Sequence, residues 1–228
     1  MPNSRKSQRS RSYPTTEGVL AKIPVDMNGR RLCTVLKNTT EWRRDEGLRK
    51  ELLEFLDGDE TDLLIVLEWA SNASDASIGR LLNVDYRTIQ QRRGKALRRI
   101  RQGVLGKLAS FRLQSEGACL MSILTTSKVP IEIDAYAVSL VGFERPFRRR
   151  PEWRQIRDWL NDHWEQLEAD VKHELRTPCM GGWHDAKSGN FVLDASVLTA
   201  DKEEAIQVAQ EQQQVSIYHL ATKRVINV

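Results

Sequence analysis

The arginine, lysine and glutamine side chains between Ala76 and Gln102 are the residues of this sequence best suited to bind a polyanion. This stretch holds eight basic residues against one acid, whereas the whole chain of 228 residues has a formal net charge of only +4. The basic residues are Arg80, Arg87, Arg92, Arg93, Lys95, Arg98, Arg99 and Arg101. Guanidinium and ammonium groups bind phosphates, and glutamine amides pair with the edge of adenine. The pattern predicts contact with nucleic acid, although a solvated basic helix that only covers a helical core would carry similar charge.

Helices are expected to position these side chains. An acidic start from Asp59 to Asp62 suits a helix N-terminus, and apolar residues follow it at helical spacing. Those residues are Leu63, Leu64, Val66, Leu67 and Ala70. Ser74 or Asp75 is suited to cap a second, short helix. Its apolar residues are Ile78, Leu81 and Leu82.

A tight turn at Asn83-Val84 is predicted to separate the second helix from a third, for which Asp85 is the expected N-cap. The inner face of the third helix is expected to hold Ile89, Ala96, Leu97 and Ile100. Three helices in this order form the helix-turn-helix pattern, in which the third helix enters the major groove of DNA.

The segment from Ser77 to Arg101, SIGRLLNVDYRTIQQRRGKALRRIR, resembles the C-terminal helix-turn-helix (region four) of the bacterial sigma-70 family. The matching positions are Ile78-Gly79, Val84, Ile89 and Lys95-Ala96-Leu97-Arg98-Arg99-Ile100-Arg101. The resemblance is confined to residues 60–103, about a fifth of the chain. It implies the fold of that domain and binding to double-stranded DNA.

Carried over by position, the family's base-contacting residues would be Tyr86, Arg87, Gln90 and Gln91. The family's usual Arg-Glu…Arg-Gln set has become Tyr-Arg…Gln-Gln here, so the usual promoter sequence does not follow. The residues expected to hold phosphates are Arg80, Arg92, Arg93, Lys95, Arg98 and Arg99.

Three functions compete at this point. The first is a sequence-specific, DNA-binding transcription regulator, and the basic third helix favours it. The second is a true alternative sigma factor, but the aromatic-rich helices with which sigma factors melt promoters have no counterpart before residue 40. The third is an adaptor that binds RNA polymerase or another protein, which would not need a basic stripe. We therefore expect the first.

The segments before this domain have a different composition. Residues 1–18 are rich in serine and arginine, and we expect a disordered basic arm. Arms of this kind lie along DNA in some proteins and only aid solubility in others. Residues 19–39 suggest a β-hairpin around Asn28-Gly29. A further helix beginning at Thr40 is expected to complete a DNA-binding domain over residues 40–104.

Residues 105–150 are expected to form a helical connector and a basic linker. The connector is predicted to be helical over residues 105–127, with an interruption at Gly117. The apolar run IEIDAYAVSLVGF that follows suits either a buried strand or a helix. The proline-bounded segment from Arg145 to Pro151 is predicted to be a linker and a second candidate for phosphate contact.

Residues 151–228 are expected to hold a long helix and a small α+β module. The helix, from Glu152 to Leu175, carries a stripe of three tryptophans, Trp153, Trp159 and Trp164. Such a stripe is more typical of a core or domain interface than of base stacking. The remaining residues suggest the order ββαββ, with one helix on one sheet. The predicted fold class is therefore mainly α, a helix-turn-helix bundle with a small C-terminal α+β module.

A catalytic or metal site is not expected. Cys179 and His184, with Asp185 beside them, have the residue types of a nucleophile and base or of half a zinc site. Only His173 and His219 are available as further zinc ligands, and their spacing does not fit. No glycine-rich phosphate loop or supported pair of acids is present. We therefore predict no enzyme and no cofactor.

The expected partner is double-stranded DNA, with RNA polymerase and a second copy of the chain as further candidates. Three widely separated cysteines suggest no disulfide framework and suit a reducing cytoplasm. No apolar run approaches the roughly 20 residues that span a bilayer. We therefore expect a cytoplasmic, nucleoid-associated protein without membrane contact.

Overall fold

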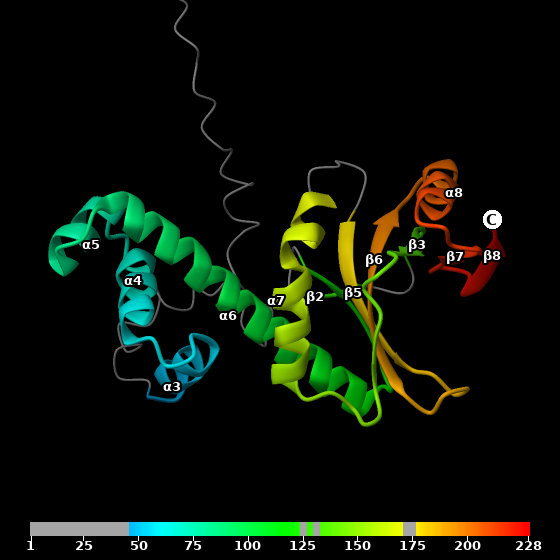
Figure 1. Ribbon diagram of the computed structural model, residues 1–228, viewed down its shortest axis with the longest axis horizontal. Coiled ribbons are helices and arrows are strands. Elements are labelled where there is room, and N and C mark those ends of the chain that lie inside the picture. Colours follow the sequence, from blue (N-terminus) through cyan, green and yellow to red (C-terminus); the bar gives the residue numbers. More distant parts are fainter. Residues whose placement is uncertain (1–45, 124–126, 130–132, 171–176) are drawn as a thin grey trace, which may run out of the picture.

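The computed structural model describes residues 46–123, 127–129, 133–170 and 177–228, and Figure 1 shows their arrangement. The predicted basic arm (1–18), the predicted hairpin (19–39) and the start of the first predicted helix lie outside these residues. The helices are α3 (Glu46–Phe55), α4 (Glu60–Ala70), α5 (Asp75–Leu82), α6 (Tyr86–Ser115), α7 (Trp153–Asp170) and α8 (Lys202–Glu211). The strands are β1 (Ala118–Ser122), β2 (Ser127–Lys128), β3 (Tyr136–Ser139), β4 (Arg145–Phe147), β5 (Thr177–His184), β6 (Phe191–Thr199), β7 (Ser216–His219) and β8 (Arg224–Asn227).

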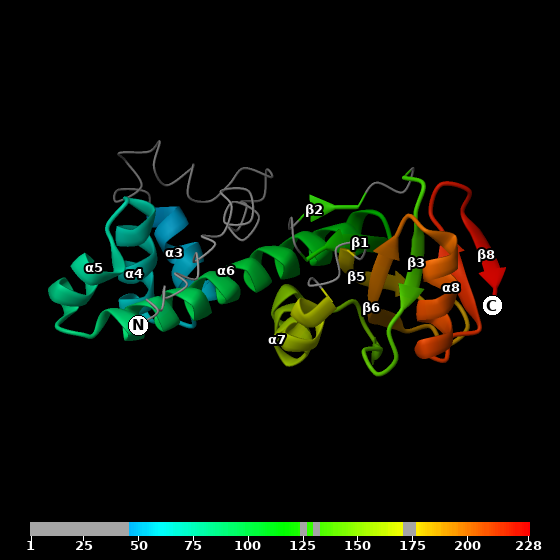
Figure 2. The same cartoon turned by 90° about the horizontal axis from the view of Figure 1, so that it is seen from above.

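A helical part is built around the N-terminal half of α6, against which α3, α4 and α5 pack (Figures 1 and 2). Its core includes Leu52, Phe55, Leu56, Leu63, Val66, Leu67, Ala70, Ala96, Ile100 and Val104. A smaller cluster joins Ile65, Ile78 and Ile89, one residue from each helix of the helix-turn-helix. The predicted inner face of the third helix is confirmed, because Ile89, Ala96 and Ile100 are buried and Leu97 is half-buried.

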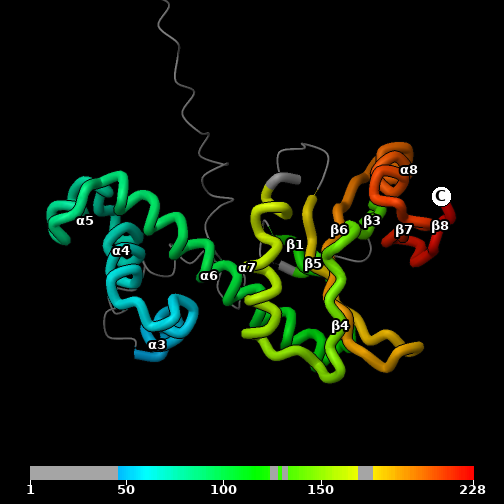
Figure 3. The backbone as a smooth tube through the Cα atoms, viewed as in Figure 1, coloured from blue at the N-terminus to red at the C-terminus, as the bar shows by residue number. Residues whose placement is uncertain are grey.

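An eight-stranded sheet occupies the other end of the molecule, in the order β2-β1-β5-β6-β3-β7-β8. The strand β4 also pairs with β6, beyond the end of β3 (Figure 3). All pairs are antiparallel, and the longest ladder runs from Thr177↔Leu198 to His184↔Phe191. The sheet is therefore organised around the β5–β6 hairpin.

One face of the sheet is covered by the C-terminal half of α6 together with α7 and α8. The alternation of side chains along each strand sends Met121, Met180 and Val197 into this core. From α7 it receives Ile156, Trp159, Leu160, Trp164 and Leu167, all buried. The tryptophan stripe is therefore largely core, as expected. The opposite face carries a smaller apolar cluster around Cys179 and Leu198.

The predicted fold class was wrong, because the chain combines helices with a large antiparallel sheet and is not mainly α. The helix expected through residue 127 ends at Ser115, and Gly117 turns the chain with φ +76° into β1. The ambiguous apolar run contains β3, and the predicted basic linker contains β4. The order ββαββ is confirmed, but β5 pairs with β1 and β7 with β3, so these elements belong to one larger sheet.

The two parts share α6, a helix of 30 residues without a break. At about 1.5 Å per residue it is about 45 Å long. Val104 packs in the core of the helical part and Leu105 packs in the core beneath the sheet. The helix α6 therefore passes from one core to the other between these two residues. Contacts between α3 and α7 add to this joint, including an edge-to-face pair of Phe55 and Trp153 with ring centroids 5.6 Å apart. Among the described residues, no helix has the length and apolar character needed to cross a membrane.

Candidate nucleic-acid interface

The turn between α5 and α6 is fixed by backbone contacts. Asn83 ends α5 in the left-handed conformation, with φ 53° and ψ 46°. The Val84 N–H donates to the Gly79 carbonyl at 2.8 Å, and a Cβ on Gly79 would lie 2.6 Å from the Val84 carbonyl oxygen. Only glycine allows this approach, because real Cβ atoms do not come so close to oxygen. Glycine at position 79 is thus required by the turn.

The helix caps are also set by short polar side chains. Ser74, rather than Asp75, caps α5 by accepting from the Ser77 N–H at 3.2 Å. Asp85 caps α6 as predicted, because its Oδ1 accepts from the Arg87 N–H at 2.8 Å. These caps fix where α6 begins, and therefore which side chains occupy its first turns.

The four residues predicted to contact bases lie together on the exposed side of the first turns of α6. Tyr86, Arg87, Gln90 and Gln91 are all exposed, while Ile89 among them is buried. The Arg87 Nε donates to the Tyr86 hydroxyl at 3.3 Å, so these two side chains hold each other. We call Tyr86, Arg87, Gln90 and Gln91 the reading face.

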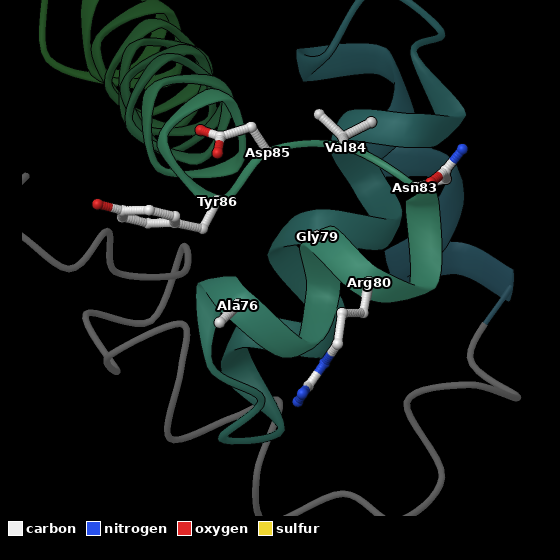
Figure 4. A pocket seen from close by; sticks show the side chains of 7 residues that line it. All are labelled: Ala76, Gly79, Arg80, Asn83, Val84, Asp85 and Tyr86. Atoms are coloured by element: carbon white, nitrogen blue, oxygen red, sulfur yellow. The ribbon is translucent and has the colours of Figure 1, made fainter.

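An open hollow lies beside the reading face, between α5 and the start of α6. Its lining residues are Ala76, Gly79, Arg80, Asn83, Val84, Asp85 and Tyr86 (Figure 4). In Figure 4 the side chains of Arg80 and Tyr86 project from the two helices on either side of Ala76. Ala76 and Gly79 have small side chains, so the hollow is open between α5 and α6. A ligand that entered it would have the cation of Arg80 at its edge.

The predicted phosphate-binding cations fall into two groups, and the first is engaged within the protein. Arg92 donates from Nε to Asp62 at 2.7 Å and lies 3.0 Å from Asp59, the N-cap of α4. A hydrogen bond from the Asp62 N–H, followed by the charge of Arg92, lowers the pKa of Asp59. These contacts hold α6 against the start of α4.

Arg93 performs the same role toward α5. Its guanidinium lies 2.6 Å from the Asp75 carboxylate and stacks over the Trp69 ring, 5.2 Å from the centroid. Further along α6, Arg98 reaches Glu168 on α7 at 3.3 Å. The sequence offered no signal for these partners, which lie 18 to 70 residues away along the chain.

The second group remains available to a ligand. Among the described residues, no carboxylate pairs with Arg80, Arg87 or Lys95. Arg99 makes only a long contact, 3.9 Å from Asp62, and is exposed. Arg87 belongs to the reading face, Arg80 lies on α5, and Lys95 and Arg99 lie further along α6.

Gly94 lies in the middle of the exposed side of α6, one turn beyond Gln90. The two other glycines deep in this helix are explained by packing. A Cβ at Gly103 would lie 2.2 Å from the Phe55 ring, and one at Gly106 would lie 2.6 Å from the Trp153 carbonyl oxygen. A Cβ at Gly94 would meet nothing within 4 Å. Glycine weakens a helix interior relative to alanine, so nothing inside the described fold accounts for it there.

Cys179 and His184 are not brought together. They are five positions apart on β5, which places their side chains on opposite faces about 16 Å apart. Burial raises the pKa of the Cys179 thiol well above its usual range. His219 instead contacts Asp134 at 2.8 Å and Thr222 at 2.7 Å. Because Asp134 and Thr222 are exposed, this group suits a turn contact better than a sheltered reaction site.

Asp194 is a buried acid that sequence reasoning missed. It is 1% exposed on β6, where its Oδ1 accepts from the Ala195 N–H at 2.7 Å. Its Oδ2 has no hydrogen-bond partner among the described residues. Burial, with a smaller contribution from the charge of Glu144, raises the pKa of Asp194 to about 6.

Comparisons of the chain with protein-family models, with curated proteins and with solved structures find no match.

Proposed function

We propose that this protein is a sequence-specific, double-stranded-DNA-binding regulator of transcription that reads the major groove with the first turns of α6. The observation that carries the proposal is the reading face, an exposed set of Tyr, Arg and two Gln side chains on a capped helix. It is supported by the cations around it that have no carboxylate partner. Major-groove readers present such residues from the N-terminal end of the recognition helix.

Each side chain of the reading face has a chemical role in this proposal. Arg87 pairs with O6 and N7 of guanine, and Gln90 and Gln91 pair with N6 and N7 of adenine. Tyr86 contacts a thymine methyl group or a phosphate. Arg80, Lys95 and Arg99 hold phosphates and fix the register on the duplex. Arg92 and Arg93 act indirectly, by holding α6 against α4 and α5.

The test begins with selection of preferred duplexes from a random library by the full chain. Affinity is then measured by fluorescence anisotropy on the selected site and on a scrambled one. Arg87→Ala and Gln90→Ala should each cost about 1–3 kcal/mol on the selected site and little on the scrambled one. Lys95→Ala, the matched control, should weaken both about equally.

Two results would count against this function. If no duplex is enriched and the chain does not bind DNA at low salt, the DNA-binding proposal fails. If the Arg87, Gln90 and Lys95 variants all lose affinity in the same ratio on both duplexes, the reading face has been misplaced. The regulatory role is tested separately, by genomic footprinting and by transcript levels when the gene is deleted.

A further inference from the structure

Three consecutive arginines in the connection from β4 to α7, beside the C-terminal half of α6, form another set of available cations. Arg148, Arg149 and Arg150 are exposed, and no carboxylate in the described part of the chain pairs with them. Other arginines of this half are engaged. Arg112, Arg145, Arg154 and Arg157 lie 2.5 to 2.9 Å from carboxylates. We call Arg148–Arg150 the arginine loop.

The arginine loop is held in place at both ends. On one side β4 pairs with β6, with Phe147 opposite Phe191. On the other side the Ser110 hydroxyl of α6 donates to the Pro151 carbonyl at 3.3 Å. Arg150 also stacks over the Phe191 ring, 5.6 Å from its centroid. The three charges are therefore presented from a fixed position on the sheet.

The hydrogen bond from Ser110 to Pro151 also relates the position of the arginine loop to that of the reading face, because Ser110 and the reading face lie on the same helix. Ser110 follows Tyr86 by 24 residues on one unbroken helix. At about 1.5 Å per residue, this is about 36 Å. One helical turn of duplex DNA spans about 34–36 Å. Figure 2 shows the start of α6 and helix α7 toward its lower edge, and Figure 1 shows the connection from β4 to α7 well below the start of α6.

The surface between them, on α7, would repel DNA if its acids were free. Its exposed acids are instead paired with arginines. Asp158 pairs with Arg157 and Asp162 with Arg145. Glu165 and Glu168 both lie near Arg98. Three arginines within 4 Å of these four carboxylates reduce the negative field along this route without cancelling it.

We propose that the arginine loop binds the phosphate backbone of the same duplex, about one helical turn away from the bases read by α6. This inference rests on the proposed function and adds a second contact to it. The site takes DNA phosphates without reading sequence, since only guanidinium groups are presented. The shared helix α6 sets the spacing.

The test compares two duplexes in anisotropy titrations with the full chain. One carries the selected site in about 12 base pairs, and the other carries it within about 30. The triple variant Arg148→Ala, Arg149→Ala, Arg150→Ala should bind the short duplex as the wild type does. On the long duplex it should lose about tenfold or more in affinity, and its salt slope should fall by about 2–3.

The matched control removes three charges elsewhere. Lys202, Lys223 and Arg224 are exposed and have no carboxylate partner among the described residues. Their triple alanine variant should bind both duplexes like the wild type. Should the arginine-loop variant be unstable, Arg148→Gln with Arg149→Gln keeps the Arg150–Phe191 contact and should show a smaller loss of the same kind.

The outcomes separate this inference from the proposed function. If the arginine-loop variant equals the wild type on the long duplex, or loses affinity equally on both, the second contact does not exist. If the control loses as much as the arginine-loop variant, the effect is only net charge and the inference also fails. If the wild type binds neither duplex, the proposed function itself has failed. Arg87→Ala should lower affinity for both lengths.

Discussion

The guanidinium of Arg92 lies 2.7 Å from the carboxylate of Asp62, whose side chain is only 8% exposed. Arg92, which belongs to the most basic stretch of the sequence, therefore neutralises the buried carboxylate of Asp62. A buried carboxylate without a cation is costly, so this pair fixes the distance between α4 and α6. The cationic stripe thus has two roles, holding the domain together and contacting a ligand.

Arg92→Ala should therefore lower the free energy of unfolding, by about 1–3 kcal/mol after allowance for the partial exposure of Arg92. Lys95→Ala, three residues away and without a carboxylate partner, should leave stability within about 0.5 kcal/mol. Urea denaturation followed by circular dichroism measures both. Equal stabilities for the two variants would contradict the structural role assigned to Arg92.

The salt dependence of DNA binding should reflect only the available cations. For a short duplex the cations assigned to phosphates are Arg80, Lys95 and Arg99, which corresponds to a log–log slope of about −3. If all eight basic residues of the stretch contacted phosphates, the slope would be near −7. Anisotropy titrations across a salt series distinguish the two, and a slope near zero would count against binding through phosphates.

Local signals in the sequence predicted the local parts of this structure. The cap at Asp85, the turn at Asn83 and the inner face around Ile89 each depend on residues within one or two helical turns. The pairing of Arg92 with Asp62 could not be predicted, because it depends on how two helices meet. For a related reason the strand β4 was missed, and the run that contains β3 was left open as strand or helix. Both are short, and only their ladders with β6 stabilise them.

Stability should also depend on the ionisation of Asp194. Its pKa is about 6 in the folded protein, against an ordinary value of 3.8. Between these values the folded state keeps a proton that the unfolded state releases. The free energy of unfolding contributed by this group therefore falls as pH rises from about 4 to about 6, and is flat above that.

Asp194→Asn removes this penalty, because the amide stays neutral. The variant should be more stable than the wild type by about 2–3 kcal/mol at pH 8. The difference should shrink to near zero at pH 4. Urea titrations of both proteins at several pH values provide the measurement. A wild-type advantage at pH 8 would mean that the carboxylate has a stabilising partner.

The last prediction concerns Gly94, where stability and binding should change in opposite directions. Alanine fits without a clash, since an added Cβ meets nothing within 4 Å. It should raise the free energy of unfolding by about 0.5–1 kcal/mol, because glycine is the weaker helix former. If the DNA backbone approaches α6 closely at this point, the same methyl group should weaken binding. We expect about a tenfold loss, or about 1.4 kcal/mol.

Gly103→Ala is the matched control on the same helix. Its Cβ would lie 2.2 Å from the Phe55 ring, so it should lower stability by about 1–3 kcal/mol. At a temperature where it is still folded, its DNA affinity should remain near that of the wild type. Thermal unfolding and anisotropy on the selected site measure both properties. If Gly94→Ala is more stable and binds DNA unchanged, then DNA does not approach α6 at Gly94. The contact surface would then end at the first two turns of the helix.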